Sequence, residues 1–294
     1  MTPQGKLGLR GGVTRVAYLG PAGTYSEEAL RASAPAGVQE VPYPSLHEAV
    51  MAVEAGQVDR AVVPIENVLE GAVGVTLDTL AVEARNVRIV GEVVHPIHHC
   101  VVGAGEVDLA AVTRVVSHPQ ATAQCSRFLR ERLAGAELVS APSTADAVLS
   151  VCGSDDPAVA LGSRLAAELY GCRVLVADVE DHPDNATRFV WLAPAGAAGQ
   201  PGPDAKTSIV FWGGGDQAPG WLVDALSELS ERGVNLTRIE SRPRRMALGH
   251  YMFFADVEGA AGEPPVNDAL DALRGRVEEL RILGSYGRFG QAPG

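Results

Sequence analysis

Short apolar runs alternate with longer amphipathic segments along the first part of the chain. The apolar runs at 13–19, 38–41 and 60–65 predict buried strands, and a helical pattern follows each of them. Residues 45–48 (SLHE) fit a capping box, which predicts the start of one of these helices. Strands that alternate with helices predict a parallel sheet covered by helices.

The segment 87–102 interrupts this alternation, because it is too long and too β-rich for one strand and contains Pro96. We interpret it as a crossover into a second lobe. The alternation then resumes, with one helix expected at about 119–133, and 173–177 is interpreted as the return crossover. Two α/β lobes joined by two crossovers predict a bilobal, periplasmic-binding-protein-like architecture, with a cleft between the lobes at the strand ends.

The pattern changes after a stretch rich in Pro, Gly and Ala, which predicts a linker. Beyond it, strands at 207–212, 234–240, 250–257 and 281–283 and two helical patterns, the second at about 266–280, give the order β-α-β-β-α-β. This order is typical of a ferredoxin-like α+β domain. The expected division is a first domain over 13–194 (lobe 1 at about 13–92 and 174–194, lobe 2 at about 93–173), a linker over 195–204 and a second domain over 205–286.

The chain has 294 residues and a formal net charge of −12. A nucleic-acid partner needs a basic face, so this charge argues against one. An anionic small substrate would have to be held by local features, such as an arginine or the backbone N–H groups of a helix N-terminus. No stretch has the length and apolarity of a membrane span, and residues 1–12 lack the apolar run of a signal peptide, so we expect a cytoplasmic protein without a membrane partner.

Four cysteines are widely spaced without a C-x-x-C pair, and each lies in or beside an apolar segment. This pattern is typical of buried, reduced thiols in a cytosolic protein. The four are Cys100, Cys125, Cys152 and Cys172.

Polar residues stand at the ends of four predicted strands, where chemistry on α/β folds concentrates. They are Gly23-Thr24, Glu66-Asn67, Ser117 and Thr187-Arg188. Thr187 offers a hydroxyl that donates and accepts hydrogen bonds, and Arg188 offers a permanent charge shaped for a carboxylate. Neighbours on a strand point to opposite faces, so only one of this pair faces a given pocket unless the turn twists them.

Two further patterns are weak. His95, His98 and His99 suggest a metal site, but adjacent strand residues point apart and no carboxylate or thiolate lies at a helpful spacing, so we expect no metal. Residues 213–218 formally match the dinucleotide pattern G-x-G-x-x-A, but the next two strands lack a crossover helix between them, so we expect no nucleotide there.

Several stretches, in order and over nearly the whole chain, resemble prephenate dehydratase with a C-terminal ACT regulatory domain. They include YLGPAGTYSEEA (18–29), PIEN (64–67), SHPQATAQC (117–125), NATRFV (185–190) and NLTRIESRP (235–243). The resemblance implies decarboxylating dehydration of prephenate to phenylpyruvate, without metal or organic cofactor. It also implies L-phenylalanine as effector, and a homodimer or homotetramer formed through the ACT and catalytic domains.

The resemblance also assigns residues position by position. The implied catalytic residues are Thr187, Asn67, Ser117 and Gln124. The expected substrate-binding residues are Arg188, Glu66, Thr24 and Gly23; Arg188 as partner of a substrate carboxylate is our own inference. The expected effector-binding residues are Gly220, Trp221, Leu222, Asn235, Leu236, Glu240, Ser241, Arg242 and Pro243.

This chain departs from the family pattern at two places. Val68 replaces the usual serine after Glu-Asn, and Trp221 replaces the usual alanine of a Gly-Ala-Leu stretch. The larger Trp221 side chain leads us to expect weakened or altered phenylalanine inhibition.

Two other functions remain open from the sequence. One is arogenate dehydratase, with the same fold and chemistry on an amino-group substrate. The other is a catalytically silent amino-acid sensor, against which the retained Thr187 argues. A fused chorismate mutase is not expected, because only about a dozen residues precede the first strand.

Overall fold

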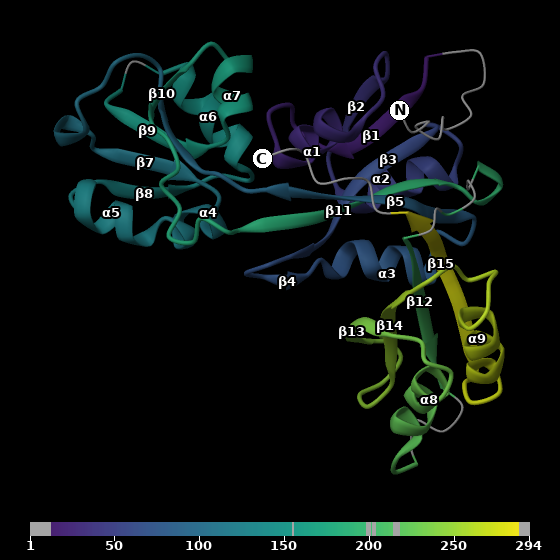
Figure 1. Ribbon diagram of the computed structural model, residues 1–294. Coiled ribbons are helices and arrows are strands. Elements are labelled where there is room, and N and C mark those ends of the chain that lie inside the picture. The colour runs from purple at the N-terminus through teal and green to yellow at the C-terminus, as the bar shows by residue number, and fades with distance from the viewer. Residues whose placement is uncertain (1–12, 155, 198–200, 202–203, 214–217, 288–294) are drawn as a thin grey trace.

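The chain forms three β-sheets, two side by side and the third below them, as Figure 1 shows for this computed structural model. The structure describes residues 13–154, 156–197, 201, 204–213 and 218–287. Residues 1–12, part of the expected linker and most of the 213–218 segment lie outside the described residues. Among the described helices, none is long and apolar enough to cross a membrane.

Lobe 1 is built on a sheet with the strand order β2-β1-β3-β11-β5, with β4 beside β3. Its elements are β1 (Arg15–Leu19), α1 (Tyr25–Ser33), β2 (Gln39–Tyr43), α2 (Leu46–Glu54), β3 (Arg60–Asn67), β4 (Gly71–Ala72), α3 (Gly74–Val82), β5 (Val87–Pro96) and β11 (Ala186–Pro194). Ser45 caps α2 as expected, because its Oγ accepts from the Glu48 N–H at 3.1 Å. The sheet is mixed and not purely parallel, since β11 returns from lobe 2 and runs antiparallel to both of its neighbours.

Lobe 2 is built on a sheet with the order β10-β6-β9-β7-β8. Its elements are β6 (Cys100–Gly103), η1 (Leu109–Ala111), β7 (Arg114–Ser117), α4 (Pro119–Gln124), α5 (Ser126–Arg132), β8 (Glu137–Ser140), α6 (Thr144–Cys152), β9 (Ala158–Gly162), α7 (Arg164–Leu169) and β10 (Arg173–Val176). The single helix expected at 119–133 is broken at Cys125. Asp181 explains the break, because its carboxylate caps the second helix through the Arg127 N–H at 3.0 Å and the Ser126 hydroxyl at 2.8 Å.

The third sheet has the order β13-β14-β12-β15, which is the ferredoxin-like order. After η2 (Ala195–Ala197), its elements are β12 (Ala205–Trp212), α8 (Trp221–Ser230), β13 (Leu236–Pro243), β14 (Tyr251–Glu258), α9 (Val266–Arg274) and β15 (Glu279–Gly287). The last helix is shorter and the last strand longer than expected. Gly275 caps α9, and five residues that we assigned to the helix lie in the turn and at the start of β15.

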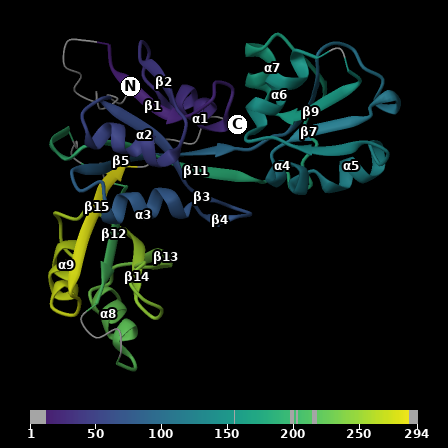
Figure 2. The ribbon, with the colours of Figure 1, turned by 180° about the vertical axis from the view of Figure 1, so that it is seen from behind.

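The third sheet packs against lobe 1, as the view from behind in Figure 2 also shows. On one face, α8 and α9 cover the sheet with their own apolar core. On the other face, Met252 and Phe254 join a single core with Leu77 and Leu80 of α3. The backbones of β15 and β5 come so close that a side chain at Gly284 would collide with the Ile89 carbonyl, which explains the glycine there. The third sheet is thus part of the same packed body as lobe 1.

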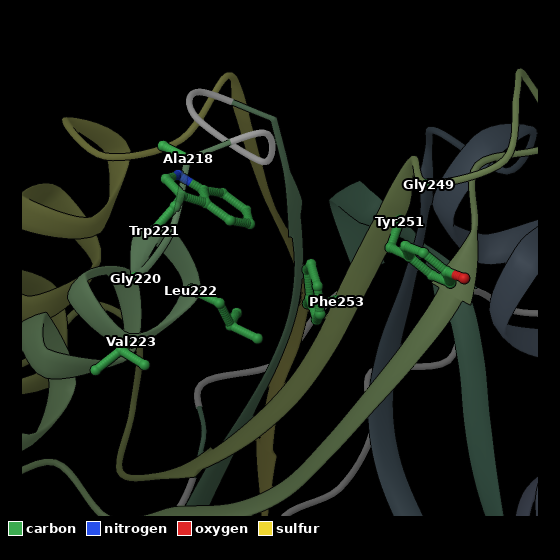
Figure 3. A pocket seen from close by; sticks show the side chains of 8 residues that line it. All are labelled: Ala218, Gly220, Trp221, Leu222, Val223, Gly249, Tyr251 and Phe253. Carbon is green, nitrogen blue, oxygen red and sulfur yellow. The ribbon is translucent and has the colours of Figure 1, made fainter.

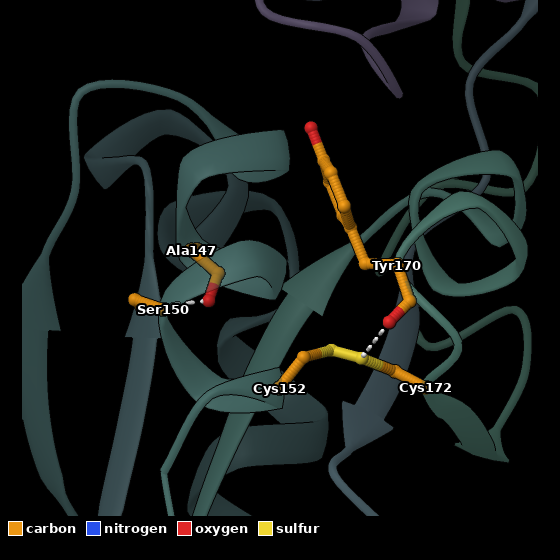
Figure 4. Close-up of a disulfide and its surroundings, with 5 residues drawn as sticks. All are labelled: Ala147, Ser150, Cys152, Tyr170 and Cys172. Carbon is orange, nitrogen blue, oxygen red and sulfur yellow. Dashed lines mark hydrogen bonds between the residues drawn. A yellow bond between two sulfur atoms is a disulfide. The ribbon is translucent and has the colours of Figure 1, made fainter.

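The cysteines differ from the expectation. Figure 4 shows a disulfide that joins Cys152 at the end of α6 to Cys172 just before β10, with a Cα–Cα distance of 5.8 Å. Only Cys100 and Cys125 are free thiols, both buried. The two paired residues are 20 positions apart, and the packing of α6 against α7 brings the ends of these helices near each other, so spacing alone could not reveal the pair.

Candidate active site

Thr187 and Asn67 lie opposite each other on the neighbouring strands β11 and β3. Asn67 Nδ2 donates to Thr187 Oγ1 at 2.9 Å, and both side chains are more than nine-tenths buried. Asn67 Oδ1 accepts from the backbone N–H groups of Leu69 and Glu70, which fixes the amide orientation. Within the described part of the chain, nothing accepts a hydrogen bond from Thr187 Oγ1, so its proton is available to a ligand.

Hydrogen bonds continue from this pair across both lobes. Asn67 Nδ2 also donates to Asn185 Oδ1 at 3.0 Å, and Asn185 Nδ2 donates to Gln124 Oε1 of α4 at 3.2 Å. Gln124 Nε2 in turn donates to Glu70 Oε1 at 3.2 Å. The structure therefore unites three of the four expected catalytic residues, with Asn185 as the connecting residue between the lobes.

His99 is a second partner of the Gln124 side-chain oxygen. Its Nε2 lies 3.0 Å from Gln124 Oε1, and its Nδ1 lies 2.8 Å from the hydroxyl of Tyr25. Because a carboxamide oxygen only accepts, this geometry assigns the proton of the neutral ring to Nε2. Burial lowers the pKa of His99 below its usual 6.5, so the ring is neutral at neutral pH.

His99 should also make the protein sensitive to acid. The unfolded chain binds the His99 proton near pH 6.5 and the folded chain only at lower pH, so the free energy of unfolding should decrease as the pH falls below about 6.5. Between pH 7.5 and 5.0 we expect wild type to lose more stability than His99→Asn, by about 1.4 kcal/mol for each unit by which folding lowers the pKa. Urea unfolding checks this, with His182→Asn, at an exposed histidine, as the matched control. Equal losses in all three proteins would contradict the assignment.

Ser117, the fourth expected catalytic residue, does not join this network. It ends β7 and is fully buried, and its hydroxyl donates to the Leu161 carbonyl at 2.8 Å. In this structure its observed contact lies within lobe 2.

The turn that contains Gly23 and Thr24 connects the two lobes instead of presenting free donors to an anion. The Gly23 N–H donates to the buried Glu27 carboxylate, and the Thr24 hydroxyl donates to the Leu19 carbonyl. The Gly23 carbonyl accepts from Ser163 Oγ of lobe 2 at 2.7 Å. Gly23 has φ +88°, and a Cβ there would lie 2.9 Å from Ala166, so contact between the lobes accounts for the glycine.

Arg188 and Glu66, which we expected to hold the substrate, are not brought together with the Thr187 hydroxyl. Strand alternation turns them to the face opposite Thr187 and Asn67. There the Arg188 guanidinium lies 2.7 Å from Asp256 of the third sheet and 3.4 Å from Glu66. Its charge is already compensated by protein carboxylates.

The expected effector residues fall into two groups. Gly220, Trp221 and Leu222 line a hollow of about 200 Å³ together with Ala218, Val223, Gly249, Tyr251 and Phe253. Figure 3 shows Trp221 and Leu222 on the α8 side of this hollow and Phe253 on the β14 side. Gly220 has φ +87°, which favours glycine at the start of α8.

The second group lies at or beside the edge strand β13: Asn235, Leu236, Glu240, Ser241, Arg242 and Pro243. These residues do not line the hollow. Arg242 instead makes a two-pronged contact with Asp78 of α3, at 3.0 and 2.9 Å. This residue therefore connects the third sheet to lobe 1.

The histidines are used in different ways. His98 and His99 point in different directions, as expected for neighbours, and His95 lies 3.0 Å from Glu28. His98, Asp178 and Glu180 bring potential metal-ligand atoms within 4.8 Å of one another. His98 Nδ1 is already paired with Glu180 at 2.7 Å, and two of the three side chains are exposed.

Sequence reasoning missed Asn185, His99 and Tyr25 as members of the network. Asn185 stands in the same stretch as Thr187, two positions earlier, so its place on the strand end was a usable signal. His99 had been considered only as a metal ligand. Tyr25 lies 74 positions from His99, and no local pattern connects the two.

Comparison with known proteins gives two family matches. The prephenate dehydratase model matches residues 16–196, and the ACT domain model matches residues 207–275. A prephenate dehydratase of Amycolatopsis methanolica is 40% identical over 278 residues, which cover 94% of this chain and 89% of that protein.

Two solved structures have a similar fold over nearly the whole chain. The prephenate dehydratase of Arthrobacter aurescens in complex with L-Phe has a TM-score of 0.86 and 37% identity, covering 94% of this chain and 90% of the other. A protein described as a novel type of quorum-quenching acylase has a TM-score of 0.83 and 35% identity, covering 94% and 98%.

Proposed function

The chain belongs to the prephenate dehydratase family and ends in an ACT domain, and from this premise we propose which residues perform the reaction. The protein is a lyase that converts prephenate to phenylpyruvate with loss of carbon dioxide and a hydroxyl group, and phenylalanine regulates it. The proposal assigns the reaction to the network around Thr187.

Thr187 is proposed to assist the leaving hydroxyl. As the carboxylate carbon leaves as carbon dioxide, its bonding electrons enter the ring, the C–O bond at the opposite carbon breaks, and negative charge grows on that oxygen. The Thr187 hydroxyl accepts from Asn67 and has its own proton free for that oxygen. A hydrogen bond that strengthens as charge develops stabilises the transition state more than the substrate.

The single observation that carries this proposal is that, among the described residues, no cationic side chain is hydrogen-bonded to the network, whose charged neighbour is the Glu70 carboxylate. Hydroxyl, amide and neutral imidazole groups make up the connected chain from Thr187 through Asn67, Asn185 and Gln124 to His99. A fixed cation against the departing carboxylate would stabilise it as an anion and oppose its loss. Arg188 points toward the ACT domain instead, where Asp256 lies 2.7 Å from it. We propose Gln124 as a polar contact of the bound substrate.

Turnover of the purified protein tests the proposal. Prephenate and arogenate are supplied separately, each with and without phenylalanine, and phenylpyruvate or phenylalanine is measured as product. Phenylpyruvate from prephenate is expected. Product from arogenate but not from prephenate would mean that arogenate is the substrate. No product from either would favour a catalytically silent sensor. An N-acylated amine substrate tests the acylase activity described for one structural relative.

We propose further that two copies associate through their ACT domains, within a homodimer or homotetramer. The effector residues are divided between the hollow and the edge strand β13, and Ile239 on this strand is 43% exposed. A second copy at this edge would cover the strand and could complete the effector site. A cytoplasmic location and the division into a catalytic domain (13–194), a linker and an ACT domain (205–286) are part of the same proposal.

Trp221 should influence the response to phenylalanine. Its indole is 9% exposed, lies 5.9 Å from the Phe253 ring and donates to the Arg276 carbonyl at 2.8 Å, so it occupies volume at the edge of the hollow. We expect Trp221→Ala to lower the phenylalanine concentration for half-inhibition about tenfold, equivalent to about 1.4 kcal/mol of binding. Inhibition assays check this, with Trp221→Phe as an intermediate control. Strong inhibition of wild type at low phenylalanine that is unchanged in Trp221→Ala would contradict it.

A further inference from the structure

Six charged side chains meet between the lobe 1 sheet and the ACT sheet, and we call them the Arg188 cluster. Its members are Arg188, Glu66, Glu92, Lys206, Arg238 and Asp256. Three are positive and three negative, so the cluster is balanced. The side chains are at most 11% exposed, except Glu66 at 39%. Charges buried in this way are maintained only by their partners.

Arg188 holds the centre of the cluster. Its Nη2 lies 2.7 Å from Asp256 of β14, and its Nη1 lies 3.3 Å from Glu92 of β5. Burial opposes the charge on Arg188, but the carboxylates of Asp256 and Glu92 keep its pKa above the usual value. Neither Arg188 Nη2 nor Asp256 Oδ2 makes a well-angled hydrogen bond within the described residues. The attraction between Arg188 and Asp256 is therefore mainly Coulombic.

The ACT side of the cluster is fixed by the ACT sheet itself. Ser208 Oγ donates to Asp256 Oδ1 at 2.6 Å and also lies 2.7 Å from the Tyr286 hydroxyl. These three residues belong to adjacent strands β14, β12 and β15. A change in the ACT sheet therefore moves Asp256 with it.

The lobe 1 side of the cluster lies one residue from the proposed catalytic hydroxyl. Thr187 and Arg188 are neighbours on β11, and their partners on β3, Asn67 and Glu66, are neighbours too. The register of β11 against β3 shifts between Arg188 and Phe189. The pairs Thr187–Asn67 and Arg188–Glu66 therefore lie on the same side of this irregularity. Both members of the hydrogen bond that orients Thr187 thus have a cluster residue directly beside them.

We propose that Arg188 is a positioning residue, through which the ACT sheet sets the position of the Thr187 hydroxyl. Phenylalanine bound to the ACT domain changes the geometry around Asp256, and the Arg188–Asp256 pair transmits that change to β11. The inference rests on the proposed role of Thr187 and adds the route by which the effector reaches it. Coupling of this kind needs a physical element that both sites influence, and the Arg188 cluster is that element.

Asp256→Asn tests the route from the ACT side, at a residue that contacts Arg188 and is not part of the hydrogen-bond network around Thr187. The variant keeps the size of the side chain and the contact with Ser208 but removes its charge. We expect a lower kcat with little change in KM. We also expect the phenylalanine-induced change in kcat to shrink by about fivefold or more, which is the lower end of ordinary allosteric coupling. Phenylalanine binding, measured by calorimetry, should persist.

Asp78→Asn is the matched control. It neutralises another ACT–lobe 1 ion pair, with Arg242 and Arg245, that does not touch β11, so kcat without phenylalanine should stay at the wild-type value. If both variants lose kcat equally, general loosening of the interface explains the loss and the proposal fails. Arg188→Gln alone and combined with Asp256→Asn completes a double-mutant cycle, in which the combined loss should be about that of one substitution alone.

Hydrogen exchange separates this inference from the proposed function. In wild type, phenylalanine should change the exchange protection of peptides covering 186–190, and in Asp256→Asn it should not. Absence of turnover with prephenate would overturn the proposed function. The exchange result would still decide whether phenylalanine acts on β11 through Asp256. No effect of phenylalanine on 186–190 in wild type, or the same effect in both proteins, would overturn the inference even if wild type turns over normally.

Discussion

Thr187→Ala should lower kcat with prephenate by about 10²–10³-fold, the loss expected when one donor to a developing negative charge is removed. The proton of Thr187 Oγ1 has no acceptor within the described residues, while Asn67 holds the oxygen at 2.9 Å. Alanine leaves the rest of the network intact, so KM should change little. Initial-rate kinetics of phenylpyruvate formation measures both constants.

A serine variant and two measurements of folding serve as controls for Thr187→Ala. Thr187→Ser keeps a hydroxyl that Asn67 can still orient, so it should retain more activity than Thr187→Ala by at least about tenfold. Circular dichroism and thermal unfolding should show an intact fold for both variants. An alanine variant within twofold of wild type would remove Thr187 from the mechanism.

Asn67→Asp should be nearly as harmful, although it hardly changes the size of the side chain. The carboxylate can still accept from the backbone N–H groups of Leu69 and Glu70, but it cannot donate to Thr187. Thr187 would then turn its own proton toward the new carboxylate and away from the leaving hydroxyl. We expect kcat to fall by about 10²-fold or more, on the scale of losing the donor itself.

The pH dependence of this variant distinguishes a reversed hydrogen bond from a damaged fold. At low pH the new carboxyl group becomes protonated and can donate again, so kcat should partly recover relative to wild type as the pH falls. Asn185→Asp is the matched control, because Asn185 contacts Asn67 and Gln124 but not Thr187. It should lose less activity. An Asn67→Asp variant with flat relative activity across pH would count against the reversal.

The alternation of apolar and polar segments was sufficient to predict the two lobes and the ferredoxin-like order of the third sheet. It failed where distant residues decide local structure. Asp181 ends one helix and begins another at Cys125, and the apolar pattern continues through that point. The position of β11 likewise depends on the free edges of β3 and β5, between which it inserts antiparallel to both. The local spacing of apolar residues in β11 carries no information about those distant strands.

The candidate site was predictable only in part, for a similar reason. Strand alternation correctly implied that Thr187 and Arg188 point apart. It could not say which of them joins the hydrogen-bond network between the lobes, because the opposite face is covered by a domain whose docking the sequence does not reveal. Arg188 was therefore assigned to substrate, although Asp256 is its partner. Gly23 was interpreted as part of an anion-binding turn, whereas contact with Ala166 explains it.

The place of β11 between β3 and β5 has a consequence for synthesis of the protein on the ribosome. Both neighbours are made before lobe 2, and β11 follows only after it. At about 5–20 residues per second, the roughly 90 residues between β5 and β11 take about 4–18 s to translate. During this time the facing edges of β3 and β5 lack the strand that joins them. A nascent chain of this protein therefore has two unpaired strand edges, on β3 and β5, until the segment with Thr187 emerges. A chaperone that shields strand edges would act during that interval.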